Sequence, residues 1–360
     1  MAGRVSLRLK EWGKNFLAFI FGLGLIVVAL EIALRFLPVV DIYHFQRVDQ
    51  ENYIPRFAPE GAHITYSLGW NFYQVAKKRI NNLGFFNDLD YKRNPDKPVI
   101  AVIGDSYVEA MQVDNGETFF SLLQRATDRY YFYSFGASGS QLSTYLAYVD
   151  YAEKNFKPNK IIIPIISNDF DESFYEVKKA PGFWYFDGSG KPYVIEYTPE
   201  KSTWLYVRRS IAKKSVLLRY LYFNLGLPAV LQRLKGFTGP QRNIPDMELS
   251  KKAIDFFFEK LPEYTTLRPR DIVFVVDAPR EYIYQGTIDE AKKSTFGVIR
   301  DYFIKEAQKR NYVVVDMLPV FYEHYRTNGK RFEFPTDGHW NELGHYLVAQ
   351  ELKKVLNLSR

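Results

Sequence analysis

Five residues spread along the chain are of the types that acyl transfer to a serine requires. Ser106, Gly139 and Asn168 each come soon after an apolar run, and Asp337 and His339 follow much later on an expected loop, with one residue between them. A serine hydroxyl becomes a nucleophile when a base removes its proton, and an imidazole oriented by a carboxylate can act as that base. The sequence therefore predicts Ser106 as a nucleophile, His339 as its base and Asp337 as the carboxylate behind the imidazole.

Donors for an oxyanion can be predicted from the same residues. Attack on an ester carbonyl creates an oxyanion, which is stabilised by hydrogen-bond donors fixed in advance in a pocket without water. The backbone amides of Ser106 and Gly139 and the side-chain amide of Asn168 are the candidates. Gly-Asp-Ser or Asp-Gly-His alone is typical of an ordinary turn. The prediction depends on all these residues arriving in order at strand ends, with compatible partners.

Alternating strands and helices are expected to hold these residues. Apolar runs predict strands over residues 99–103, 130–135, 161–166, 272–276 and 312–315. Apolar residues spaced i, i+3, i+4, i+7 predict helices between the strands, and a final helix is expected over 341–356. Repeated strand–helix units predict an α/β fold, a three-layer α/β/α sandwich with a parallel sheet of the flavodoxin-like kind. In such sheets the ligand lies beyond the carboxyl ends of the strands, where the candidate residues fall.

Four short sequence blocks of this chain resemble those of a known superfamily. Gly104-Asp105-Ser106, the segment 134–139, Asn168-Asp169 and the late Asp337 and His339 are similar to the four blocks of the SGNH (GDSL-type) hydrolases. The resemblance covers roughly residue 98 to the C terminus, apart from 170–246. It implies the sandwich fold, ester bonds as the target, no cofactor, and the site roles given above.

Two departures from the superfamily pattern are visible. Ile166 stands where the family usually has a glycine, which predicts a reshaped oxyanion hole. One residue rather than two separates Asp337 from His339. The resulting Asp-x-His-Trp form is similar to a membrane-anchored branch that includes bacterial polysaccharide O-acetylation enzymes.

The N terminus predicts a membrane anchor. Basic residues in 1–14 precede a run without charge over 15–30, and Glu31 and Arg35 lie near its far end. About 20 apolar residues span a bilayer. By the positive-inside rule, 1–14 is a cytoplasmic tail, 15–37 a transmembrane anchor, and the remainder extracytoplasmic, in a bacterial periplasm. A cleaved signal peptide is the alternative, but Ala-Leu-Glu and Ala-Leu-Arg make poor cleavage sites.

Two further segments complete the expected organisation. Residues 38–97 are interpreted as an extracytoplasmic spacer with a few strands, and 98–360 as the hydrolase domain. Within that domain, 170–246 is an aromatic and basic insertion expected to act as a lid over the site. It contains Trp204, Arg208-Arg209, Lys213-Lys214 and an apolar helical stretch over 216–225. That stretch is expected to pack on the domain, with binding to a membrane surface as the alternative.

Two tryptophans and four further histidines are the other candidates for ligand binding. Trp184 in the insertion and Trp340 beside the base are candidate substrate-binding residues, since an indole can stack on a sugar ring or wall a pocket. His44, His63 and His324 have no partners at ligand spacing, so no metal is predicted, and His345 is expected to be structural or exposed.

Composition narrows the functional class. Hydrophobic residues make up 47% of the 360, enough for a sizeable core, and the absence of cysteine excludes thiol catalysis, cysteine-bound zinc and disulfides. The formal charge of +7 is dispersed and accompanies no nucleic-acid motif, so no nucleic-acid partner is predicted.

Three functions follow as hypotheses. The first is a membrane-anchored extracytoplasmic serine esterase that removes short acyl groups, acetyl above all, from envelope or secreted carbohydrate. The second is an O-acyltransferase that uses the same triad to acylate a polysaccharide, with a membrane acyltransferase as partner. The third is a catalytically silent carbohydrate-binding protein in which Ile166 has spoiled the oxyanion hole. Residue types do not separate the first two, because both pass through an acyl-serine.

Overall fold

The computed structural model describes residues 2–59, 61–198, 214–228 and 245–358, with side chains from Trp12 onward. The chain divides into two compact units. The N-terminal unit comprises Met1–Ile42, Thr65–Val75 and Ser202–Pro240, and the sheet unit comprises Tyr43–Ile64, Ala76–Lys201 and Gln241–Arg360.

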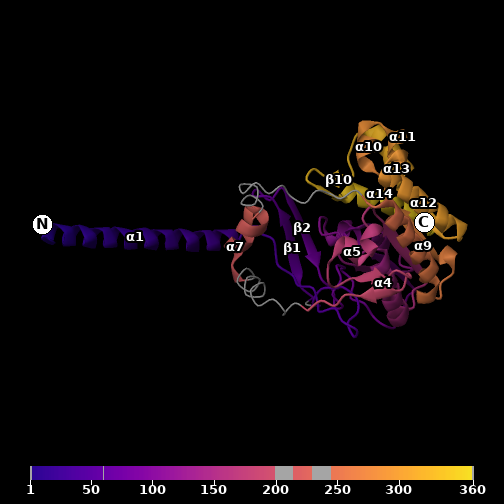
Figure 1. Cartoon of the computed structure of the whole chain (residues 1–360), viewed down its shortest axis with the longest axis horizontal. Coiled ribbons are helices and arrows are strands. Elements are labelled where there is room, and N and C mark those ends of the chain that lie inside the picture. The colour runs from indigo at the N-terminus through magenta and orange to yellow at the C-terminus, as the bar shows by residue number, and fades with distance from the viewer. Residues whose placement is uncertain (1, 60, 199–213, 229–244, 359–360) are drawn as a thin grey trace. The chain divides into compact units, whose positions relative to one another are not determined.

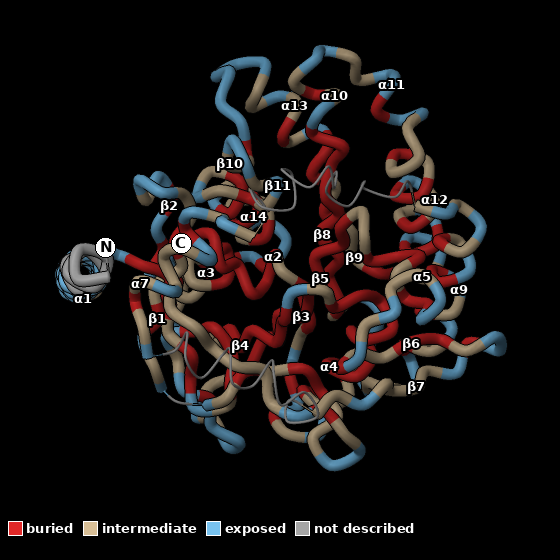
Figure 2. Tube along the Cα trace, turned by 60° about the vertical axis from the view of Figure 1, so that its left-hand side comes forward, coloured by how far each residue is buried: buried red, intermediate tan, exposed pale blue. Residues whose placement is uncertain are grey.

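A five-stranded parallel sheet forms the centre of the sheet unit, with the strand order β4-β3-β5-β8-β9. Counted along the chain, this is the flavodoxin-like order 2-1-3-4-5. Ile103 lies opposite Phe135, and Ile163 lies opposite Phe274. Figure 2 shows these strands as a largely buried row. Their bounds are β3 (Val99–Gly104), β4 (Tyr131–Gly136), β5 (Lys160–Ile165), β8 (Ile272–Val276) and β9 (Val313–Asp316).

Helices cover both faces of the sheet (Figure 1). Successive strand residues point to opposite faces, so Ala101 and Ile163 belong to one core and Val102 and Ile162 to another. The first core includes residues of α4 (Leu142–Phe156), α9 (Met247–Tyr264) and α12 (Thr295–Lys309). The second includes residues of α3 (Phe119–Ala126), α13 (Met317–Asn328) and α14 (Glu342–Val355). The predicted three-layer sandwich with a parallel sheet is confirmed.

Short elements fill the connections of the sheet unit. The helical ones are α2 (Ser106–Glu109), η1 (Asn115–Glu117), η2 (Asp171–Ser173), α5 (Tyr175–Lys178), η5 (Pro269–Asp271), α10 (Arg280–Gln285) and α11 (Ile288–Lys293). The strands are the antiparallel pairs β6 (Trp184–Phe186) with β7 (Pro192–Val194) and β10 (Glu333–Phe334) with β11 (Asp337–Trp340). The sequence predicted a loop at Asp337 and His339, and this was wrong, because the pairing with β10 makes the segment a strand. In a further pair, β1 (His63–Leu68) and β2 (Gln74–Arg79), each strand contains one boundary between the two units.

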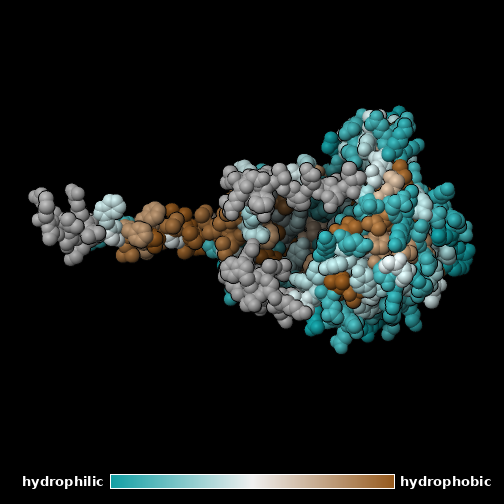
Figure 3. All heavy atoms as spheres, in the orientation of Figure 1, coloured by the Kyte–Doolittle hydropathy of each residue, from teal (hydrophilic) through white to brown (hydrophobic). Residues whose placement is uncertain are grey.

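The N-terminal unit contains α1 (Ala2–Leu34), α7 (Val216–Arg219) and the π-helix η4 (Tyr220–Asn224). Within α1, Trp12–Leu34 is long and apolar enough to cross a membrane. Figure 3 shows this part of α1 as an apolar rod. The helix ends at Leu34, three residues before the expected end of the anchor at residue 37.

The expected insertion does not stay in one unit. Its first part, including β6 and β7, belongs to the sheet unit, whereas α7 and η4 belong to the N-terminal unit. These two helices account for the predicted apolar helical stretch over 216–225. Trp204, Arg208-Arg209 and Lys213 lie outside the described residues, so the lid stays a prediction.

Candidate active site

Ser106 stands at the junction between the central strand β3 and helix α2. Asp105 caps this helix by accepting the backbone N–H of Tyr107 at 2.9 Å, as a residue at a helix N-terminus commonly does. Gly104 permits the turn, because a Cβ there would lie 2.6 Å from Cγ2 of Val108. Asp105 is fully buried, and burial raises the pKa of its carboxyl. Asp105 therefore acts as the structural cap of α2.

The structure brings Ser106, Asp337 and His339 into one hydrogen-bonded line. His339 Nε2 lies 2.8 Å from Ser106 Oγ, and His339 Nδ1 contacts Asp337 Oδ1. The same carboxylate oxygen accepts the backbone N–H of His339 at 3.0 Å. Because the carboxylate is an acceptor, it favours the tautomer that carries a proton on Nδ1 and leaves Nε2 to accept from the serine hydroxyl. Burial raises the pKa of Asp337, but hydrogen bonds and the charge of His339 outweigh it and leave this pKa lowered.

Gln112 is a neighbour of this line that sequence reasoning missed. Its Nε2 lies 3.1 Å from Asp337 Oδ2 and 3.0 Å from His339 Nδ1. It donates to the second carboxylate oxygen and so helps to fix the carboxylate plane against the imidazole. A glutamine distant in sequence from both partners gives no signal of this contact, which the folded chain alone creates.

A buried polar network holds the peptide between Asp337 and His339. Arg280 Nη2 donates to the carbonyl oxygen of Gly338 at 2.8 Å, and the Tyr107 hydroxyl donates to the same oxygen at 2.9 Å. Arg280 also pairs with Asp277 at 3.1 Å, and Asp277 accepts Trp340 Nε1 at 3.0 Å. The network therefore ties β11 to the end of β8. The position of Asp277 directly after a predicted strand was the available signal, and it was missed.

The candidate oxyanion donors are available to a ligand. Gly139 has a φ of +86°, a left-handed conformation that favours glycine. In the described part of the chain, no protein group accepts a hydrogen bond from the backbone N–H of Ser106 or Gly139, or from the side chain of Asn168. Ile166, which stands where the superfamily has glycine, is only 3% exposed and belongs to the second core. Its side chain therefore lies in the core.

Contacts on both sides fix the peptide that carries Gly139. Glu109 accepts the backbone N–H of Ser138, and Lys178 Nζ donates to the carbonyl oxygen of Gly139. Lys178 is also paired with Glu172 at 2.8 Å. Burial raises the pKa of Glu109 to about 7. These charged neighbours of the candidate hole carried no signal in the sequence.

The two tryptophans predicted to bind substrate lie in different surroundings. Trp340 is 1% exposed and packs in the second core, with its Nε1 bound to Asp277. Of the two roles considered for Trp340, stacking on a sugar ring is therefore corrected: β11 is a strand, so Trp340 points away from the side that His339 faces. Trp184 on β6 donates from Nε1 to the carbonyl oxygen of Tyr53 at 2.6 Å. Its role in substrate binding stays a prediction.

His345 is buried on α14. Its Nδ1 accepts the backbone N–H of Phe119, with 3.4 Å between the two nitrogens. Burial lowers the pKa of His345 to about 3, so the imidazole is neutral. Of the two expectations, structural or exposed, the structural one holds. Among the described residues, no group of three or more His, Asp or Glu side chains is placed to hold a metal ion.

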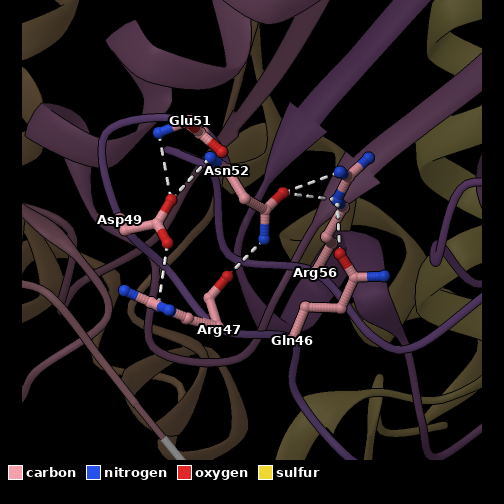
Figure 4. Close-up of a pocket in the computed structure, with 6 residues that line it drawn as sticks. All are labelled: Gln46, Arg47, Asp49, Glu51, Asn52 and Arg56. Atoms are coloured by element: carbon pink, nitrogen blue, oxygen red, sulfur yellow. Dashed lines mark hydrogen bonds and ion pairs between the residues drawn. The ribbon is translucent and has the colours of Figure 1, made fainter.

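A surface pocket of about 440 Å³ lies at residues other than the predicted site. Figure 4 shows its polar groups paired with one another, as in the bonds from Arg56 to Gln46 and Asn52. None of the predicted site residues lines it, and we assign it no part in acyl chemistry. Its lining residues are Gln46, Arg47, Asp49, Glu51, Asn52 and Arg56.

Comparisons with known proteins give distant similarities only. No family model and no curated protein matches the chain. Similar solved structures include a lipolytic G-D-S-L family member from Veillonella parvula, with 12% identity and a TM-score of 0.41, covering 72% of this chain and 98% of that one. The hydrolase LAE5 from the metagenome of Lake Arreo has 13% identity and a TM-score of 0.43, covering 74% and 99%. The acetyl xylan esterase AlAXEase has 14% identity and a TM-score of 0.40, covering 72% and 99%. Similarities at this level assign no function by themselves.

Proposed function

We propose that this chain is a serine esterase of the SGNH type that cleaves its substrate through an acyl-enzyme on Ser106. One observation carries the proposal, the hydrogen-bonded line from Ser106 Oγ through His339 to Asp337. Such a line lets the imidazole take the serine proton while the carboxylate stabilises the imidazolium that forms. The line lies at the carboxyl end of the parallel sheet, where ligands of this fold class bind.

The proposed reaction has two halves. Ser106 Oγ attacks the ester carbonyl carbon as His339 Nε2 takes the hydroxyl proton, and the carbonyl oxygen becomes an oxyanion. The amides of Ser106, Gly139 and Asn168 donate to that oxygen. The tetrahedral intermediate then expels the alcohol, which receives the proton from His339. Water attacks the acyl-serine with His339 again as the base, releasing the acid and restoring the serine hydroxyl.

The finer parts of the proposal concern place and substrate. We propose that α1 anchors the enzyme with its basic end in the cytoplasm and its sheet unit in the periplasm, and that the substrate is a short acyl ester of an envelope or secreted carbohydrate. The apolar span Trp12–Leu34 supports the anchor. Because the chain has no cysteine, a single cysteine replacing exposed Ser189 tests the orientation. A membrane-impermeant maleimide added to cells with a permeabilised outer membrane labels Ser189→Cys if the orientation is correct; labelling only after lysis contradicts it.

Catalysis is tested on the full chain in detergent with a chromogenic acetyl ester. Ser106→Ala is expected to lose at least about a thousandfold in kcat, since the nucleophile is gone. The matched control is Ser189→Ala, because Ser189 lies in an exposed turn where it bonds Asp187. Equal activity of Ser106→Ala and the control would refute the proposal. Mass spectrometry of a glycan incubated with an acyl donor then separates hydrolysis from the transferase hypothesis by loss or gain of acyl groups.

A further inference from the structure

Exposed apolar side chains are concentrated in the N-terminal unit. Outside α1, thirteen large hydrophobic residues of the described chain are exposed, and ten of them belong to this unit. The other three, Tyr175, Tyr346 and Val355, lie singly in the much larger sheet unit. Scattered exposed apolar residues are normal on a soluble surface, whereas a concentration of them marks an interaction surface. The ten come from three segments, 36–37, 70–75 and 218–227.

The third segment is attached to the end of the apolar span. Glu31, in the last turn of α1, accepts the backbone N–H groups of Val216 and Leu217, each at 3.0 Å, and the hydroxyl of Ser215 at 2.9 Å. The Glu31 carboxylate therefore accepts hydrogen bonds from N–H groups in the first turn of α7, which have no acceptor within the helix. Leu34 of α1 packs with Val216 in a small apolar cluster. Helix α7 is thus held where the span ends.

The second segment is tied to the third. The Tyr220 hydroxyl donates to the carbonyl oxygen of Trp70 at 2.8 Å, and Asn224 Nδ2 donates to Ser67 Oγ at 2.8 Å. Arg219 also donates to the carbonyl oxygen of Val40 at 3.1 Å, in the segment that leaves α1. These bonds tie the second segment to the third, and the third segment to the part of the chain that follows α1.

We propose that residues 36–37, 70–75 and 218–227 form a membrane-interface collar, which lies in the headgroup region of the bilayer that α1 spans. This inference rests on the proposed anchor. The occupant of the apolar surface is the lipid bilayer, because the collar begins at Phe36, two residues after the span ends, and is continuous with it. Trp70, Tyr73 and Tyr222 add the amphipathic rings that favour the interface between lipid and water. The collar gives the N-terminal unit a second attachment beside the span.

The test uses single cysteines in the cysteine-free full chain, one in each segment: Phe36→Cys, Trp70→Cys and Leu218→Cys. The control is Tyr346→Cys, because Tyr346 is 48% exposed on the sheet unit and Leu218 is 43% exposed. Each cysteine carries the dye NBD, and the protein is reconstituted in vesicles of phosphatidylcholine and phosphatidylglycerol. Lipids with a quencher near the headgroup are expected to quench the three collar positions about threefold or more above the control. Iodide in the water should quench the control more strongly.

Failure of the collar can be separated from failure of the anchor. Ile26→Cys places the same dye in the middle of the span, where a quencher deep in the acyl chains should reach it. If Ile26 is quenched and the collar positions behave like Tyr346, the collar is refuted and the anchor stands. If Ile26 is not quenched, the anchor is refuted as well. Collar signals that weaken as protein is diluted at constant lipid would identify a second copy of the chain as the occupant and also overturn the proposal.

Discussion

Replacing Arg280 with methionine tests how the buried network positions the proposed catalytic line of Ser106, His339 and Asp337. The guanidinium donates to Gly338 and to Asp277, and Nη1 also pairs with Glu333 at 3.2 Å. The side chains of Arg280 and Asp277 are 10% and 3% exposed. Methionine keeps the length of the side chain and removes every donor, which leaves the buried Asp277 carboxylate and the partly buried Glu333 carboxylate without this partner.

The magnitude follows from the burial of the pair. Removing one partner of a buried ion pair costs about 3–5 kcal/mol, because the other charge stays buried without compensation. Asp277→Asn in the same chain removes one of those charges. The loss in free energy of unfolding of the double variant should therefore be smaller than the sum of the two single losses by about 1–3 kcal/mol. Gly338 keeps the Tyr107 hydroxyl as a donor, and displacement of the β11 peptide should lower kcat by up to about a hundredfold.

The assay combines unfolding and kinetics. Denaturant unfolding of the four proteins of the cycle in detergent gives the free energies of unfolding, and hydrolysis of an acetyl ester gives kcat and KM. Arg280→Lys is the matched control, because an ammonium keeps the charge but lacks the planar fork that serves several acceptors, and it should fall between wild type and Arg280→Met. The reasoning is refuted if Arg280→Met unfolds within about 1 kcal/mol of wild type, or if its effect adds to that of Asp277→Asn.

Two further predictions concern a glycine and a buried histidine. Gly139→Ala places a side chain at a φ of +86° with its Cβ 3.2 Å from Lys178 Nζ; the strained peptide should misplace one oxyanion donor and lower kcat on the acetyl ester about a hundredfold. The control Gly188→Ala, where a Cβ meets nothing within 4 Å, should leave kcat unchanged. Equal kcat values for Gly139→Ala and Gly188→Ala would contradict the role assigned to Gly139. Burial lowers the pKa of His345 to about 3, so between that pH and the unfolded value near 6.5 only the unfolded chain takes the proton, and stability falls as pH falls. From pH 7.5 to 5 this linkage removes about 2 kcal/mol, a loss that His345→Gln should lack in denaturant unfolding; an unchanged pH dependence in the variant would show that another group is responsible.

The sheet could be predicted because its strands are buried on both faces. Continuous apolar runs then mark them without periodicity, and the predicted 161–166 and 272–276 differ from β5 and β8 by at most one residue. The helices α10 and α13 were not predicted. Their short amphipathic pattern lies between motifs, and their packing depends on the fold around them.

The hydrogen-bonded line of Ser106, His339 and Asp337 could also be predicted, because these residue types are the ones that a serine nucleophile, its base and an orienting carboxylate require. The supporting residues could not be predicted in the same way. Gln112 and Arg280 act through contacts with residues more than fifty positions away, and no local pattern encodes such contacts. The error at Trp340 came from treating β11 as a loop, where neighbouring side chains can share a face, rather than as a strand, where they alternate.

The most direct test of the proposed chemistry is active-site labelling with a fluorophosphonate, followed by peptide mass spectrometry of the full chain. The reagent forms a covalent bond only with a serine whose hydroxyl is activated by a base. We predict a single phosphonate on Ser106, its loss in Ser106→Ala, and strongly slowed labelling in His339→Ala, because Nε2 lies 2.8 Å from the serine oxygen. An unlabelled Ser106 in the active wild-type protein, or labelling at an unchanged rate in His339→Ala, would contradict the account.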